Sequence, residues 1–239
     1  MDPRQRLIVA LDVSTAAAAR KIVAAVGDSA QTYKVGMQLY TAEGPSIVRE
    51  LIDSGHRVFL DLKYHDIPTT VGAAVREAAQ LGVSMVTVHA SGGGKMLRAA
   101  VEAAYAAKPD LLVLAVTVLT SFDDVELGKI GLRAGVLDQV LRLTALALSN
   151  GCQGVVASAL EAGALREEFG NEFGNDFAIV TPGVRLAGTG LHDQARVVTP
   201  SEALAAGASH IVVGRPITGA SDPTAEARAI LGQMAGLRC

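Results

Sequence analysis

The chain has 239 residues, half of them hydrophobic, and a formal net charge of −3 at pH 7. This length suits one large domain or two small ones and is enough to bury a substantial core. The near-neutral charge, without a basic stripe or an acidic tail, argues against nucleic-acid binding through bulk electrostatics and favours a small molecule as the partner.

The cysteines and the apolar runs indicate the compartment. Cys152 and Cys239 lack metal-binding spacing, and a structural disulfide to the chain end is not expected. We therefore predict a reducing, cytoplasmic environment. Asp12 interrupts the first apolar run and no small-residue cleavage site follows, so no signal peptide is predicted. The longest strongly apolar run, residues 111–119, is about half a membrane span, so no membrane association is expected.

Short apolar runs, many of them β-branched, recur along the chain. They predict eight strands, near residues 6–12, 33–36, 57–63, 84–89, 111–119, 154–158, 177–183 and 210–215. Ala-rich helical patterns lie between them, including residues 15–27, 69–82, 95–107, 136–151 and 200–208. Several of these patterns end in glycine, as helix C-termini often do.

Eight repeats of strand and helix predict a parallel sheet built from βαβ units. Continuous apolar strands are typical of a sheet that is covered on both faces. Eight such units in a chain of this length match a TIM barrel, so we predict an α/β fold with one (β/α)8 domain over residues 1–239. An open doubly wound sheet is the alternative that this pattern leaves open.

In a TIM barrel the active site lies at the carboxyl ends of the strands. Asp61 and Lys63 are two residues apart on the third predicted strand, so their side chains should share one side. Asp12 ends the first predicted strand, and Lys34 lies within the second. Both are expected at a similar depth in the barrel as Asp61 and Lys63. A buried ion-pair network that serves only the fold is the alternative. Because apolar replacements of such networks are often as stable, four charges at one mouth favour a functional site.

The loops after the seventh and eighth strands often bind phosphate in these barrels. Here they contain Gly183 and Gly214, where backbone N–H groups could approach a phosphate closely. Arg185 and Arg215 could clamp it, and Gln194 offers an amide donor. Residues 183–198 are polar and Gly-rich, which predicts a mobile loop.

Two other patterns do not indicate a site. The segment at residues 91–96, "SGGGKM", lacks the spacing and the final Ser or Thr of a Walker loop, so a glycine turn before a helix is expected. The five histidines are scattered, and Lys63 would repel a cation held by His65 and Asp66. We therefore predict no metal and no organic cofactor.

Several motifs in this order resemble the orotidine 5′-phosphate decarboxylase family in its bacterial form, over essentially the whole chain. They are "ALDV", "YKVGMQL", "FLDLKYHDIPTTV", "VTVLTS", "TPGVR", "DQARVVTP" and "IVVGRPIT". Related barrels with the same D-x-K-x-x-D core use Mg²⁺ and carry an acidic residue where this chain has Lys34, so Lys34 favours the metal-free branch. Thr69 departs from the Asn that is common in the family, with little expected consequence.

The resemblance implies a carbon–carbon lyase that converts orotidine 5′-phosphate to UMP in pyrimidine nucleotide synthesis. It also implies a homodimer in which Asp66 and Thr70 reach the partner's site. Lys63, whose charged form is favoured by flanking carboxylates, would stabilise the carbanion at C6 and protonate it. Asp61 would either repel the substrate carboxylate or hold Lys63 in place.

The resemblance assigns the remaining residues to binding. Asp12 and Lys34 would bind ribose hydroxyls, with Lys34 also ordering the array of Asp61, Lys63 and Asp66. The ribose and the pyrimidine amide edge would meet Thr120 and Ser121. The 5′-phosphate would be bound by a set comprising Arg185, Gln194, Gly214 and Arg215.

Two other functional classes stay open from the residues alone. A metal-dependent sugar-phosphate decarboxylase or aldolase of the same superfamily would need Mg²⁺. A non-catalytic phosphate-binding barrel would bind a nucleotide without turning it over.

Overall fold

Eight parallel strands form a closed barrel in the computed structural model, which describes residues 2–174, 176–185 and 198–236. The strands are β1 (Leu7–Ala10), β2 (Thr32–Gly36), β3 (Arg57–Tyr64), β4 (Met85–His89), β5 (Leu112–Val116), β6 (Gly154–Val156), β7 (Ala178–Pro182) and β8 (His210–Val213). Each strand pairs with the next one in the sequence, and β8 pairs with β1. This last pairing confirms the predicted TIM barrel and excludes an open doubly wound sheet.

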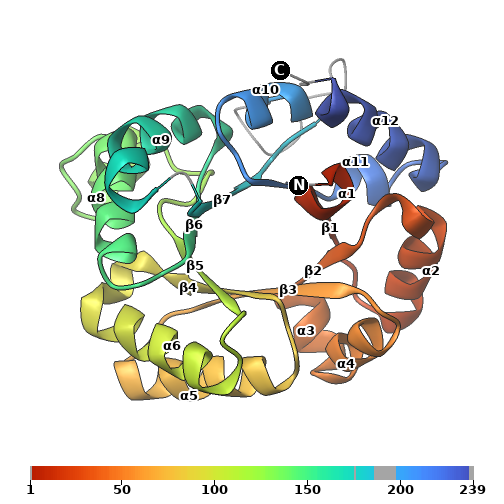
Figure 1. Ribbon diagram of the computed structural model, residues 1–239, viewed down its shortest axis with the longest axis horizontal. Coiled ribbons are helices and arrows are strands. Elements are labelled where there is room, and N and C mark those ends of the chain that lie inside the picture. The colour runs from red at the N-terminus through yellow and green to blue at the C-terminus, as the bar shows by residue number, and fades with distance from the viewer. Residues whose placement is uncertain (1, 175, 186–197, 237–239) are drawn as a thin grey trace.

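Helices surround the ring of strands, as Figure 1 shows. They are α1 (Pro3–Arg6), α2 (Ala16–Val26), α3 (Met37–Glu43), α4 (Ser46–Asp53), α5 (Pro68–Gln80), α6 (Gly93–Ala107), α7 (Asp124–Lys129), α8 (Val136–Leu148), α9 (Ala159–Phe173), α10 (Pro200–Ala205), α11 (Arg215–Thr218) and α12 (Pro223–Ala235), with short 3₁₀ turns η1 (Gly27–Ser29) and η2 (Ala90–Gly92). The five predicted helical stretches correspond to α2, α5, α6, α8 and α10. Within the described residues, no helix has the length and apolar character needed to cross a bilayer.

Local capping explains where several helices begin. The Thr15 hydroxyl accepts a hydrogen bond from Ala18 N–H at the start of α2. Ser158 and Glu161 form a capping box at the start of α9. The Ser158 hydroxyl is therefore used to accept a hydrogen bond from the helix backbone and not to bind a ligand. Pro200 occupies the first turn of α10, where its missing N–H costs nothing.

Two apolar cores lie on either side of the sheet. The larger one joins the outward faces of the strands to the helices. The smaller one lies inside the barrel and consists only of strand residues: Ile8, Ala10, Phe59, Met85, Leu114, Ala178, Val180 and Val212. Because this interior is filled, a ligand can enter only at the ends of the barrel.

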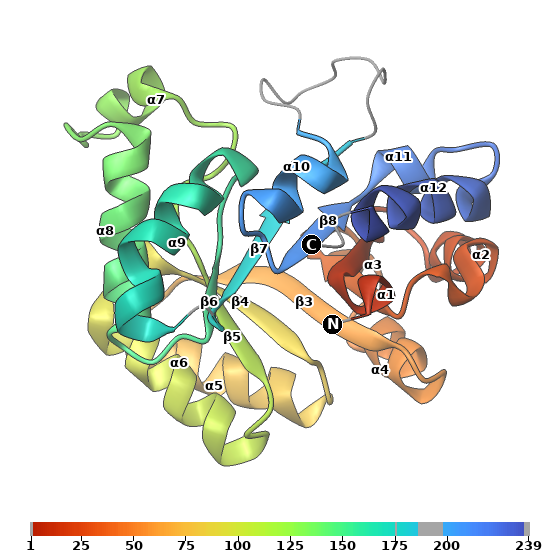
Figure 2. The same cartoon turned by 45° about the horizontal axis from the view of Figure 1, so that its top comes forward.

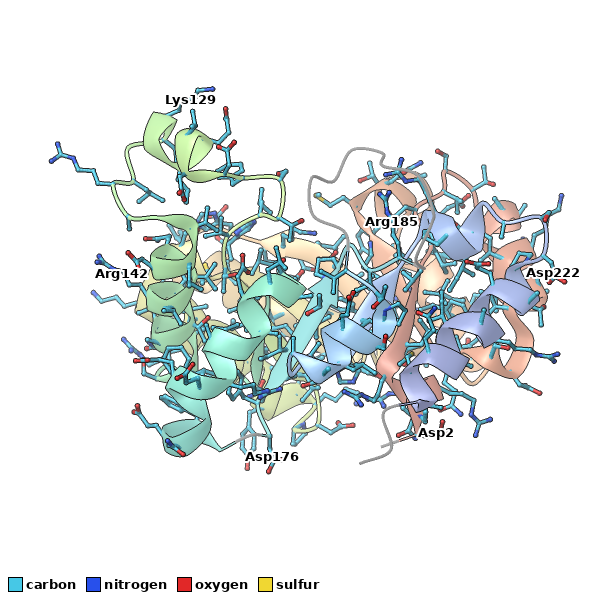
Figure 3. All side chains as sticks on the ribbon, turned by 90° about the horizontal axis from the view of Figure 1, so that it is seen from above. Asp2, Lys129, Arg142, Asp176, Arg185 and Asp222 are labelled. Atoms are coloured by element: carbon cyan, nitrogen blue, oxygen red, sulfur yellow. The ribbon has the colours of Figure 1, made fainter. Side chains whose placement is uncertain are left out.

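The two ends of the barrel differ in what projects from them. Figure 2 shows α7 projecting at one end of the barrel, on the outer rim beside α8. Figure 3 shows Lys129 of α7 and Arg185 at this end, whereas Asp2 and Asp176 lie at the opposite end. The carboxyl ends of the strands therefore open at the Arg185 end.

Candidate active site

A layer of charged side chains lies directly above the inner core. Ala10 and Phe59 belong to that core, and Asp12 and Asp61 follow each of them by two residues. Because side chains alternate along a strand, both carboxylates continue the inward-facing rows. Lys34 stands between them on β2, which pairs with both β1 and β3.

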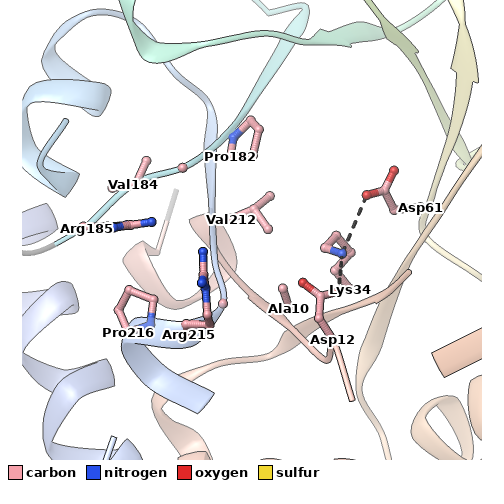
Figure 4. A pocket seen from close by; sticks show the side chains of 12 residues that line it. Ala10, Asp12, Lys34, Asp61, Pro182, Val184, Arg185, Val212, Arg215 and Pro216 are labelled. Carbon is pink, nitrogen blue, oxygen red and sulfur yellow. Dashed lines mark hydrogen bonds and ion pairs between the residues drawn. The ribbon is translucent and has the colours of Figure 1, made fainter. Parts of the chain in front are cut away.

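The four predicted charges form a continuous chain of ion pairs. Lys34 Nζ lies 2.8 Å from Asp12 Oδ1 and 3.7 Å from Asp61 Oδ2. Lys63 Nζ lies 2.9 Å from both carboxylate oxygens of Asp61. The Lys34 and Asp61 side chains are only 11% and 12% exposed, so this pairing is shielded from solvent. Figure 4 shows the Asp12–Lys34–Asp61 part of the chain.

Lys63 reaches Asp61 by an irregular route. The pairing of β3 with β4 shifts register between Leu60 and Tyr64, and Lys63 has a φ of 53°. Simple alternation of side chains along β3, the basis for predicting that Asp61 and Lys63 share a side, therefore does not hold past Asp61. The predicted contact between the two residues is nevertheless present.

A cavity of about 260 Å³ extends from the Asp12–Lys34–Asp61 chain toward the loops after β7 and β8. Gly183, Arg185, Gly214 and Arg215 line its far side, and Figure 4 shows both arginines across from the carboxylates. Gly183 has a φ of 81°, in the left-handed region that glycine adopts without strain. Four of the five residues predicted from the phosphate-binding loops therefore share one wall, and the fifth, Gln194, lies outside the described residues.

A second cavity, of about 190 Å³, lies on the Lys63 side and is mainly apolar. Its walls include Phe59, Val116, Val118, Leu119, Thr120 and Val156. It shares Lys34, Asp61, Pro182 and Val212 with the first cavity, so the two adjoin. Together they offer a charged, arginine-lined end and an apolar end with Lys63 at its edge.

Not every predicted site residue lies in this pair of cavities. Thr120 lines the apolar one, but Ser121 is exposed and lines neither. Asp66 and Thr70 are also exposed, and Asp66 accepts a 2.6 Å hydrogen bond from the backbone N–H of Ile67. Gln194 lies outside the described residues, as does most of the predicted loop.

His89 ends β4 next to the charged layer. Its ring centroid lies 5.3 Å from that of His65. Burial lowers the pKa of His89, and the nearby His65 and Lys63 lower it further. The imidazole is therefore neutral at pH 7 and adds no charge beside Lys63.

Comparison with known proteins shows which family has this sequence and fold. Residues 5–230 match the model of the orotidine 5′-phosphate decarboxylase / HUMPS family. The chain belongs to this family. It is 52% identical over 230 residues to the orotidine 5′-phosphate decarboxylase of Halorhodospira halophila, covering 96% of each chain. It is 49% identical to that of Moorella thermoacetica, covering 98% of this chain and 94% of the other.

Solved structures of the family agree. The orotidine 5′-phosphate decarboxylase of Lactobacillus acidophilus is 40% identical, with a TM-score of 0.84 over 96% of this chain and 99% of that one. The decarboxylase of Pyrococcus horikoshii is 26% identical, with a TM-score of 0.76. The resemblance inferred from the motifs is thus confirmed for the family and the fold.

Sequence reasoning does not single out the apolar wall of the second cavity or Thr87, which contacts both Asp61 and Lys63. Val116 and Val156 look like ordinary strand residues, so no pattern distinguishes their pocket position. Thr87 carries a weak signal. Thr87 places a hydroxyl group in the inward-facing row of β4, because it follows the core residue Met85 by two positions.

Proposed function

We propose that this chain decarboxylates orotidine 5′-phosphate to UMP without a metal or an organic cofactor. The observation that carries the proposal is the Asp12–Lys34–Asp61–Lys63 chain of ion pairs at the carboxyl ends of β1 to β3, in a member of this family. A lysine ammonium group held by a carboxylate suits a reaction that needs charge stabilisation and one proton.

The two adjoining cavities suggest how the substrate lies. The phosphate occupies the charged end, where Arg185 and Arg215 can pair with it and Gly183 and Gly214 line the wall. The ribose crosses the shared middle beside Asp12 and Lys34. The pyrimidine then enters the apolar cavity, beside Thr120, with C6 toward Lys63.

The chemistry follows from this placement. The bond from C6 to the carboxylate carbon breaks, CO₂ leaves, and the electron pair stays on C6. The Lys63 ammonium stabilises this negative charge and transfers a proton to C6, then recovers a proton from water. Asp61 contacts Lys63 Nζ through both oxygens and so fixes its position.

A homodimer with shared sites accounts for two of the predicted residues outside the cavities, Asp66 and Thr70. Asp66 and Thr70 are exposed at the start of α5, and Ile67 between them is 63% exposed. An isoleucine left so open beside two polar site residues suits burial against a second copy. In this proposal Asp66 completes the charged array of the partner subunit, and Thr70 contacts its substrate.

The function is tested by following the loss of orotidine 5′-phosphate by absorbance, with and without EDTA. We expect turnover at the same rate in both. Loss of activity in EDTA would support the Mg²⁺-dependent sugar-phosphate alternative. Enzymes of that kind carry an acidic residue at the position that Lys34 occupies in this chain. Binding of UMP without any turnover would instead indicate a non-catalytic phosphate-binding barrel.

A further inference from the structure

Thr87 lies inside the barrel on β4 and is fully buried. Its hydroxyl oxygen is 2.9 Å from the backbone nitrogen of Lys63 and 3.0 Å from Asp61 Oδ1. An N–H group can only donate and a carboxylate can only accept, so both directions are fixed. The hydroxyl accepts from Lys63 and donates to Asp61.

The irregularity in β3 explains why Lys63 needs this acceptor. From Leu60 to Tyr64 strand β3 advances four residues while β4 advances two, from Val86 to Val88. Thr87 is thus the β4 residue opposite the bulged segment, where the regular ladder no longer supplies partners. A buried N–H without a partner is costly, and the Thr87 hydroxyl replaces the missing carbonyl.

The contacts close a ring. Thr87 binds Asp61 and the backbone of Lys63, and Asp61 binds Lys63 Nζ through both oxygens. One hydroxyl therefore links the carboxylate that holds the ammonium group to the left-handed backbone that carries it. For a non-glycine residue that backbone conformation is uncommon and must be held by its surroundings.

We propose that Thr87 is a positioning residue that sets the place of the Lys63 ammonium group for protonation of C6. The inference rests on the proposed decarboxylation. Substrate binding through the phosphate and ribose ends does not involve Thr87, which lines neither cavity. Its loss should therefore affect the chemical step more than binding.

A threonine can be buried in this barrel without a hydrogen bond from its hydroxyl group. Thr32 on β2 is also fully buried, and within the described residues its hydroxyl has no hydrogen-bond partner. Thr32→Val therefore makes the same change of shape and polarity in the same barrel without breaking a contact to the site. It is the matched control for Thr87→Val.

The experiment compares wild-type protein with Thr87→Val, Thr87→Ser and Thr32→Val. For Thr87→Val we expect kcat to fall about 10- to 100-fold, the range for losing one charge-assisted hydrogen bond, with KM and the Kd for UMP changed by less than about threefold. Thr87→Ser keeps the hydroxyl and should recover kcat to within about threefold of wild type. Thr32→Val should match wild type in kcat.

Three results would overturn the proposal: an unchanged kcat in Thr87→Val, no recovery in Thr87→Ser, or an equal loss in Thr32→Val. If Thr87→Val does not fold, Thr87→Ala against Thr32→Ala provides the same comparison. Amide hydrogen exchange at Lys63 provides a readout independent of turnover, and it should accelerate in Thr87→Val but not in Thr87→Ser. If wild-type protein shows no decarboxylation, the proposed function fails, and unchanged exchange at Lys63 would separately refute the contact.

Discussion

The Lys34–Asp12 ion pair leaves no room for a side chain at position 36. A Cβ added to Gly36 would lie 2.9 Å from Lys34 Nζ and 3.2 Å from Asp12 Oδ1. Both atoms are the far ends of side chains, so they can move away without shifting the barrel. The glycine therefore protects the geometry of the site more than the stability of the fold.

We predict that Gly36→Ala displaces Lys34 and lowers kcat/KM at least about tenfold, the effect of roughly one lost contact to a charged group. Its melting temperature should stay within a few degrees of wild type. Gly128→Ala in α7, where an added Cβ meets nothing within 4 Å, is the control for kinetics. Wild-type kinetics in Gly36→Ala would show that the Lys34 contacts do not matter for turnover.

At this scale the sequence indicates which residues form the site but not how they are held. Asp12, Lys34, Asp61 and Lys63 are identifiable because charges are unusual at the ends of buried strands. The left-handed backbone of Lys63 has no such signal, since nothing in "FLDLKY" calls for a glycine-like conformation. It depends on a contact from β4, which lies 24 residues further along the chain.

At the scale of the elements, β6 packs against β7 at a glycine that leaves no room for a side chain. Gly154 pairs with Ala178, and a Cβ at position 154 would lie 2.2 Å from the carbonyl oxygen of Ala178 and 2.7 Å from its Cβ. A backbone atom cannot move aside as a side chain can. The seam between these two strands therefore requires glycine.

We predict that Gly154→Ala destabilises the protein by about 2 kcal/mol or more, which corresponds to roughly 5 °C or more in melting temperature. Gly163→Ala within α9 is the matched control, because its nearest neighbour would be 3.9 Å away. That substitution should be neutral or stabilise by up to about 1 kcal/mol, since alanine favours helix. Equal melting temperatures for the two variants would contradict the packing argument.

The elements were predictable where their pattern was long and apolar. All eight strands and helices such as α8 follow from apolar runs and periodicity. Residues 154–158 show the limit, because β6 ends at Val156 and Ser158 already caps α9. The short helix α7 has too few residues for a periodic signal, and its position depends on tertiary contacts such as that of Asp124 with the N–H of Val136.

For the whole molecule, stability should fall as the pH drops below neutral. Burial, and then Arg57 and Arg6, lower the pKa of His210 to about 4, and its Nδ1 has no hydrogen-bond partner within the described residues. An unfolded histidine binds its proton near pH 6.5. Between these values the unfolded state therefore binds more protons than the folded state, which favours unfolding.

We predict that the free energy of unfolding from urea titrations decreases between pH 6.5 and pH 4 by up to about 3 kcal/mol through this residue. His210→Leu removes the titrating group and keeps an apolar side chain in the core. Its stability should depend less steeply on pH over the same window. An identical slope in the variant would assign the pH dependence to other groups.

A second prediction at this scale concerns the shared sites of the proposed dimer. Lys63→Ala and Asp66→Ala should each fold and each lose turnover. Mixed after dissociation and reassociation, they should regain about a quarter of wild-type activity, because half of the dimers are mixed and one of their two sites is intact. Absence of any recovery in verified mixed dimers would place Asp66 in its own subunit's site.

The pairing of β8 with β1 has a consequence for synthesis. The barrel cannot close until residues 210–213 have left the ribosome, so one edge of β1 stays unpaired while the intervening strands β2 to β7 are made. Unpaired strand edges invite pairing with other chains. The helix α12, which packs against α1 and α2, arrives later still. We therefore expect the nascent chain to expose this strand edge until β8 has emerged, so that early folding of its first half cannot cover it.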